Sequence, residues 1–78
     1  MKLYGYKDDG LDIGEINPSE LKEITLVASP IELRRIAAFL EQAAFEMDRM
    51  GDSYSHEHLS DNDDFFENSP QFVVASEW

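Results

Sequence analysis

The most constraining feature of this sequence is a helix start, a Ser-Pro-Ile-Glu tetrapeptide that begins at Ser29. The Ser29 hydroxyl can accept a hydrogen bond from a backbone N–H of the first helical turn, and Glu32 can accept one in return from the backbone of Ser29. Pro30 falls at the first helical position, which suits its fixed φ and its missing N–H. Gly51 supplies a C-terminal stop. The sequence therefore predicts one long helix over residues 30–50.

Two sets of apolar residues lie on different sides of this helix. The first set recurs at three- to four-residue spacing, which predicts burial against a sheet: Leu33, Ile36, Ala37, Leu40, Ala44 and Met47. The second set recurs every seven residues on roughly the opposite side, and we refer to it as the seam: Ile31, Ala38 and Phe45. One sheet does not bury both sets. A second copy of the chain, a partner, or a loop carrying Phe65 and Phe66 would cover the seam, although isolated apolar residues are also ordinary on surfaces.

The rest of the chain favours short strands. Residues 21–28 carry β-branched side chains in alternation with polar ones, and Asn17-Pro18 interrupts a weaker alternation before them. We expect strands at residues 2–6, 21–28, 53–59 and 71–75, a weak one at 11–16, a turn at 8–10 and a polar loop at 60–70. The last strand is expected at or near the centre of the sheet. The prediction is one α+β domain over residues 1–78: a small antiparallel or mixed sheet of three to four strands with one long helix on one face.

Composition excludes several classes of function. The formal charge is -11, and no Lys or Arg follows Arg49; binding to nucleic acid is disfavoured because it needs clustered cations. The absence of cysteine excludes disulfides, thiolate metal sites and thiol nucleophiles. No signal peptide, membrane span, nucleophile elbow or phosphate-binding loop is recognisable. We expect a cytoplasmic protein that is not an enzyme, uses no cofactor and binds another protein.

The acidic stretch, residues 57–67, is the predicted binding region. Its carboxylates would meet a basic partner surface and Phe65 or Phe66 would anchor it. The candidate contact residues, with one flanking histidine, are His56, Glu57, His58, Asp61, Asp63, Asp64, Phe65, Phe66 and Glu67. Three other interpretations remain open: the carboxylates imitate nucleic-acid phosphates, they serve solubility only, or His56 and His58 bind a metal ion with Asp61. The alternative function is either a small metal-binding domain that uses these histidines or a regulatory homodimeric domain joined through the seam.

Three stretches together carry a family resemblance. They are the opening Met-Lys-Leu-Tyr-Gly-Tyr, residues 24–40, and His-Glu-His-Leu-Ser-Asp at 56–61 ahead of Phe-Val-Val at 72–74. The chain resembles immunity protein 32, a family of small predicted immunity proteins of bacterial polymorphic toxin systems. The resemblance implies an α+β protein of the cytoplasm that binds and neutralises a cognate toxin without catalysis. It assigns no functional residues.

Overall fold

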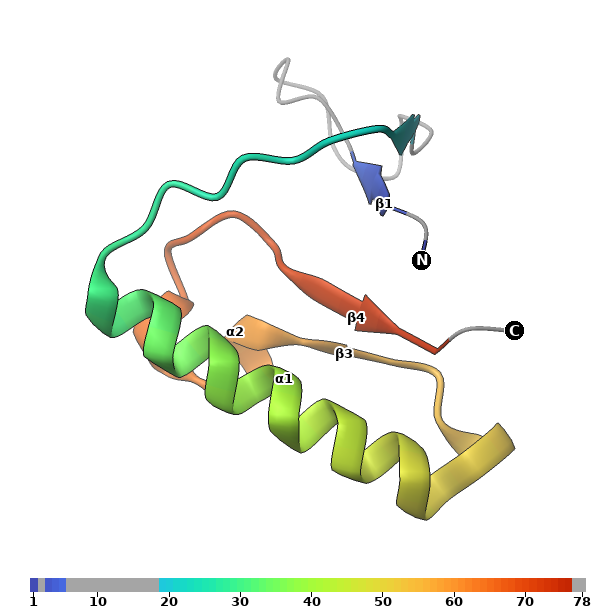
Figure 1. Cartoon of the computed structure of the whole chain (residues 1–78). Coiled ribbons are helices and arrows are strands. Elements are labelled where there is room, and N and C mark those ends of the chain that lie inside the picture. The colour runs from blue at the N-terminus through green and yellow to red at the C-terminus, as the bar shows by residue number, and fades with distance from the viewer. Residues whose placement is uncertain (2, 6–18, 77–78) are drawn as a thin grey trace.

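The computed structural model describes residues 1, 3–5 and 19–76 (Figure 1). The described chain holds one long helix, one short helix, two 3-10 turns and four short strands. In chain order these are β1 (Leu3–Gly5), β2 (Ser19–Leu21), α1 (Pro30–Met50), η2 (Gly51–Ser53), β3 (His56–His58), α2 (Leu59–Asn62), η3 (Asp64–Phe66) and β4 (Val73–Ala75). Within the described residues, no helix has both the length and the apolar character needed to cross a membrane.

Helix α1 begins and ends where the sequence predicts. The backbone N–H of Ser29 donates to Glu32 Oε1 at 2.8 Å, and the N–H of Glu32 donates to Ser29 Oγ at 3.3 Å. The pKa of Glu32 is lowered because its carboxylate accepts the hydrogen bond from the Ser29 backbone N–H and, to a smaller extent, interacts with the Ser29 side chain. At the other end Gly51 has a φ of 54°, a left-handed value that an L side chain rarely adopts. Both ends are set by contacts within a few residues of the helix.

The four described strands form two separate antiparallel pairs. β1 pairs with β2, placing Leu3 opposite Leu21, and β3 pairs with β4, placing Glu57 opposite Val74. α1 lies beside the β3–β4 pair, whereas the β1–β2 pair lies away from the helix (Figure 1). The α+β class is confirmed, with the strands divided between two sheets. The expectation that β4 is central is wrong for the described residues, where it pairs with β3 alone.

The strand predicted over residues 21–28 is largely wrong. Only Leu21 belongs to a strand, β2, and residues 23–29 run from β2 to α1 without pairing to any described strand (Figure 1). Their β-branched composition favours extended backbone, but a strand also requires a neighbour to hydrogen-bond with. Ile24 and Leu26 are half-exposed and Val27 is 92% exposed. The expectations for residues 8–10 and 11–16 lie outside the described residues.

The hydrophobic core lies between α1 and the segments that follow it. Ile36 and Phe39 of α1 pack with Leu59 of α2 and Phe66 of η3, and Phe72 and Val74 pack against this group. The Phe39 and Phe72 rings meet edge to face, with their centroids 6.3 Å apart. α2 and η3 lie largely where a polar loop was expected, over residues 60–70. This segment packs against α1 because Leu59 and Phe66 are buried in the core.

The buried face of α1 is turned away from the predicted stripe. Ile36, Phe39 and Ala43 are buried, whereas Leu33 and Leu40 are 47% and 44% exposed. Phe39 was absent from the predicted stripe, yet its large ring buries more apolar area than an alanine of that stripe. Helical periodicity identifies the apolar faces of a helix. When two apolar faces overlap, the segments that pack against the helix determine which of them is buried.

Candidate functional site

The residues of the acidic stretch differ in how far they are exposed to solvent. Asp61, Asp64 and Glu67 are exposed on α2, η3 and the turn that follows. Phe65 is 49% exposed beside them. Phe66, the alternative anchor in the sequence prediction, is only 4% exposed and belongs to the core, so it is not free to enter a partner's pocket.

Asp63 has a role within the fold. Its two carboxylate oxygens each accept from Nη1 of Arg35 at 2.9 Å, and Oδ1 also accepts from the backbone N–H of Phe65 at 3.1 Å. These hydrogen bonds, chiefly the one from Arg35, lower the pKa of Asp63. The Arg35 guanidinium also lies over the Phe65 ring, 4.5 Å from its centroid. Asp63 and Arg35 therefore hold η3 on α1 and orient Phe65 toward solvent.

The two histidines of β3 share one face of the strand, as their spacing predicted. Their ring centroids are 5.3 Å apart. Nδ1 of His56 is hydrogen-bonded to Ser55 Oγ at 2.9 Å, and Nδ1 of His58 to Gln71 Oε1 at 3.2 Å. Among the described residues, no group of three His, Asp or Glu side chains is arranged to hold a metal ion. The structure thus does not bring Asp61 together with the two imidazoles as a ligand set.

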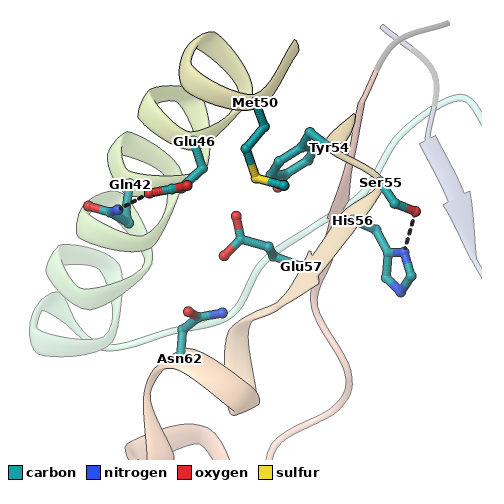
Figure 2. Close-up of a pocket in the computed structure, with 8 residues that line it drawn as sticks. All are labelled: Gln42, Glu46, Met50, Tyr54, Ser55, His56, Glu57 and Asn62. Carbon is teal, nitrogen blue, oxygen red and sulfur yellow. Dashed lines mark hydrogen bonds between the residues drawn. The ribbon is translucent and has the colours of Figure 1, made fainter. Parts of the chain in front are cut away.

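Glu57, between the two histidines, points the other way. Successive strand residues face opposite sides, and Figure 2 shows the Glu57 carboxylate directed toward α1 while the His56 ring points away. Glu57 lines a cavity of about 320 Å³ between the C-terminal half of α1 and β3. The residues that line this cavity are Gln42, Glu46, Met50, Tyr54, Ser55, His56, Glu57 and Asn62.

Two buried polar atoms in the cavity wall form no hydrogen bond with the described part of the chain. Tyr54 is 7% exposed, and neither its hydroxyl nor Glu57 Oε1 has a hydrogen-bond partner among the described residues, although both atoms are buried. The Tyr54 hydroxyl and the Glu57 carboxylate are neighbours that interact without forming a hydrogen bond of ordinary length. Burial, and then this hydrogen-bonding interaction and the negative charge of Glu57, raise the pKa of Tyr54 to about 12. Leaving a buried polar group unpaired costs about 1–3 kcal/mol, and such groups are uncommon in native proteins.

The seam is exposed in the structure. Ile31 and Phe45 are both more than half exposed, Phe45 at 59%, and Ala38 is exposed between them. The loop carrying Phe65 and Phe66 was one of the candidates for covering the seam, and the structure places it instead against Ile36 and Phe39 on another side of α1. A second copy of the chain and a different partner remain as candidates.

Sequence reasoning missed Arg35, Glu46 and Tyr54. Arg35 reaches Asp63 across 28 positions of sequence, and no local pattern predicts that pairing. Glu46 and Tyr54 contribute to the cavity only because β3 returns alongside α1 (Figure 2). One signal was present: Tyr54 is an aromatic residue within the predicted strand 53–59, and large aromatic side chains are often buried.

Comparison with known proteins gives one match. The family described as immunity protein 32 matches residues 23–77, which is more than half of the 78-residue chain. The matched range includes α1, the acidic stretch and the cavity. No curated protein and no solved structure is found to match the chain.

Proposed function

The chain belongs to the immunity protein 32 family, and from that premise we propose that it binds a cognate bacterial toxin and neutralises it. Inhibition of this kind works by occupying the toxin's surface and needs no catalytic group on the inhibitor. The proposed setting is the bacterial cytoplasm, where the producing cell must be protected. The chain's charge of -11 favours a toxin with a basic surface.

The observation that carries this proposal is an oriented aromatic side chain within an acidic surface. Phe65 is half-exposed while Arg35 stacks on its ring and Asp63 fixes its backbone. Asp61, Asp64 and Glu67 are exposed around it. An aromatic side chain held in place loses little conformational entropy on binding, which is why such residues dominate interface energetics. The contact residues that we retain are Asp61, Asp64, Phe65 and Glu67, with His56 and His58 at the edge.

The charges and the aromatic ring have different proposed roles. Uncompensated carboxylates raise the rate of encounter with a basic partner by about 10- to 1,000-fold, and salt screens the effect beyond about 8 Å. Phe65 would set the rate of dissociation by filling an apolar pocket in the toxin. The carboxylates of this surface would also match a cleft that normally binds nucleic-acid phosphates.

The experiment pairs this chain with the toxin candidate encoded beside its gene. Co-expression is expected to relieve growth arrest caused by the candidate, and surface plasmon resonance should show an association rate that falls as salt rises. Asp64→Lys with Glu67→Lys is expected to slow association at least about tenfold. Phe65→Ala should mainly accelerate dissociation, because Phe65 supplies the apolar contact.

Matched controls use the exposed carboxylates of α1. Glu41→Lys with Asp48→Lys makes the same change in net charge away from Phe65, and its association rate should fall much less than that of the Asp64 and Glu67 variant. If the association rate falls equally in the two double variants, only net charge matters, and the proposed binding surface is wrong. Failure to rescue growth, or an association rate indifferent to salt, contradicts the proposed function itself.

A second candidate function is suggested by the exposed seam. Ile31, Ala38 and Phe45 are exposed apolar residues on one side of α1, and exposed apolar surface can mark an interface between proteins. A small regulatory homodimer joined through the seam would bury it. The seam lies on α1, whereas the proposed toxin-contact residues lie on β3, α2, η3 and the turn that follows, so dimerisation and toxin binding use different residues.

A further inference from the structure

The cavity between α1 and β3 shares only His56 with the proposed contact residues described above. It lies under the C-terminal half of α1, where Glu46 and Met50 face Tyr54 and Glu57 across it (Figure 2). Its volume of about 320 Å³ is at the small end of the range of ligand pockets, about 300–1,000 Å³. A site of this size suits one inserted side chain.

The groups around the cavity include two carboxylates and several side chains that can both donate and accept hydrogen bonds. Gln42 Nε2 donates to Glu46 Oε1 at 3.2 Å, and Asn62 Nδ2 donates to the His58 carbonyl at 2.9 Å. Each amide therefore uses one of its two N–H groups within the protein, and its other N–H and its carbonyl oxygen are available to a ligand. The buried hydroxyl of Tyr54 and buried Oε1 of Glu57 have no partner among the described residues. A ligand with several N–H donors would complete these bonds.

The charge of the cavity is negative. Glu46 and Glu57 line it, and no Lys or Arg is among the lining residues. Arg49 contacts Glu46 from outside, with its Nε donating to Glu46 Oε2 at 2.9 Å, and so compensates one of the two carboxylates. The C-terminal end of α1 adds the negative end of the helix dipole. Within residues 1, 3–5 and 19–76, Glu57 forms no ion pair, and its carboxylate lies next to the Met50 and Tyr54 side chains (Figure 2).

We propose that this cavity receives a Lys or Arg side chain of the toxin, with its charged group against Glu57 and the Tyr54 hydroxyl. The apolar wall suits the methylene stem of such a side chain, which packs along apolar surface while the head group is paired. This inference rests on the proposed function for the identity of the partner. The cavity would be a second contact with the toxin: the acidic surface would steer the toxin, and the cavity would fix its orientation.

The test uses the whole isolated chain and small probes. Backbone amide NMR signals are followed while N-acetyl-lysine amide or N-acetyl-arginine amide is added, and N-acetyl-norleucine amide serves as the uncharged analogue. We expect saturable shifts at Glu46, Tyr54, Glu57 and Asn62 with a Kd of about 1–10 mM, the strength that one side chain provides. The uncharged analogue should produce no saturable shifts there.

Substitutions distinguish probe binding in the cavity from a general attraction between the probe and the negatively charged protein. Glu57→Gln is expected to weaken probe binding about tenfold or more, because it removes the unpaired charge and keeps the shape. Glu41→Gln, an equal change in charge on the exposed side of α1, should leave it within about twofold. Tyr54→Phe should weaken probe binding and raise the thermal midpoint of the free protein, since it removes an unpaired buried hydroxyl.

Three outcomes would overturn the inference: saturable shifts with the uncharged analogue, equal losses from Glu41→Gln and Glu57→Gln, or no saturation by about 100 mM probe, a limit tenfold above the weakest expected Kd. If Glu57→Gln proves poorly folded, Tyr54→Phe replaces it, because it changes the other group that the proposed contact uses. None of these measurements uses the toxin. If the probes do not bind, the growth-rescue test of toxin neutralisation still applies. If growth is not rescued, the result of the probe titration is still valid.

Discussion

At the scale of single residues, Asp63 differs most from its expected role. The sequence groups it with the partner-binding carboxylates, but its contacts with Arg35 and with the backbone of Phe65 make it part of the fold. Neighbouring carboxylates thus differ in purpose: Asp61 and Asp64 are exposed, while Asp63 is half-buried. The chain has 17 acidic and only six basic residues. Arg35, one of the six, both pairs with Asp63 and positions the Phe65 ring.

Asp63 gives a prediction about pH. Its pKa is lowered in the folded protein, so its contribution to stability is fully present above the unfolded-state pKa of about 3.9 and is lost as the pH falls through the lower folded-state pKa. Asp63→Asn should reduce the free energy of unfolding at pH 7 and reduce its loss between about pH 4 and pH 2. Urea unfolding followed by circular dichroism measures both.

The control for this prediction is Asp48→Asn, which removes an equal charge from an exposed position on α1. It should be neutral or slightly stabilising, since it reduces repulsion and removes an anion near the C-terminus of the helix. If Asp63→Asn is also neutral, the contact with Arg35 does not stabilise the fold.

At the scale of secondary-structure elements, α1 is the part most firmly specified by local sequence. Ser29, Glu32, Pro30 and Gly51 each act within a few residues of the helix ends, and the structure shows the reciprocal capping hydrogen bonds. β3 and β4 are three residues each, too short to form alone. Their pairing depends on α1, which supplies Ile36 and Phe39 for Phe72 and Val74 to pack against.

Removal of the helix cap is therefore expected to affect the whole fold. Ser29→Ala should lower the free energy of unfolding by about 1 kcal/mol, because an N–H of the first turn loses its acceptor. Thermal and urea unfolding provide the measurement, and Ser53→Ala, at an exposed serine of η2, is the matched control. A change of under about 0.3 kcal/mol in Ser29→Ala, below the usual range for a cap, would mean that packing alone fixes the helix start.

At the scale of the whole molecule, the chain is open and leaves much apolar surface exposed. Its radius of gyration is 13.4 Å, against about 11.5 Å expected for a compact chain of this length. Segment 23–29 and the seam both carry exposed apolar side chains, including Val27 and Phe45. Surface of this extent favours a protein that completes its burial by binding, consistent with an inhibitor or a dimer.

The dimer hypothesis predicts a change in mass from one substitution. If two copies join through the seam, the wild-type chain sediments as a dimer and Phe45→Glu as a monomer, because the new carboxylates would be buried without partners. Phe45 is 59% exposed in the single chain, so its fold should survive the change. Analytical ultracentrifugation at several concentrations provides the readout.

Val27→Glu is the control, since Val27 is exposed outside the seam. It should leave the mass of the dimer unchanged. A monomeric wild type, or loss of the dimer in Val27→Glu alone, would exclude the seam as the interface.

The sequence by itself determined the α+β class, both ends of α1, the positions of β3 and β4 to within a few residues, and the family. Capping, turn formation and strand propensity act between neighbours, so their signals are complete within a short window. Only the tertiary structure decided that Phe39 rather than Leu40 is buried, that Asp63 pairs with Arg35, and that Glu57 faces a cavity with Tyr54. Each of those outcomes depends on which distant segment packs against α1. The energy of such packing is shared between side chains far apart in sequence, so no local pattern contains it.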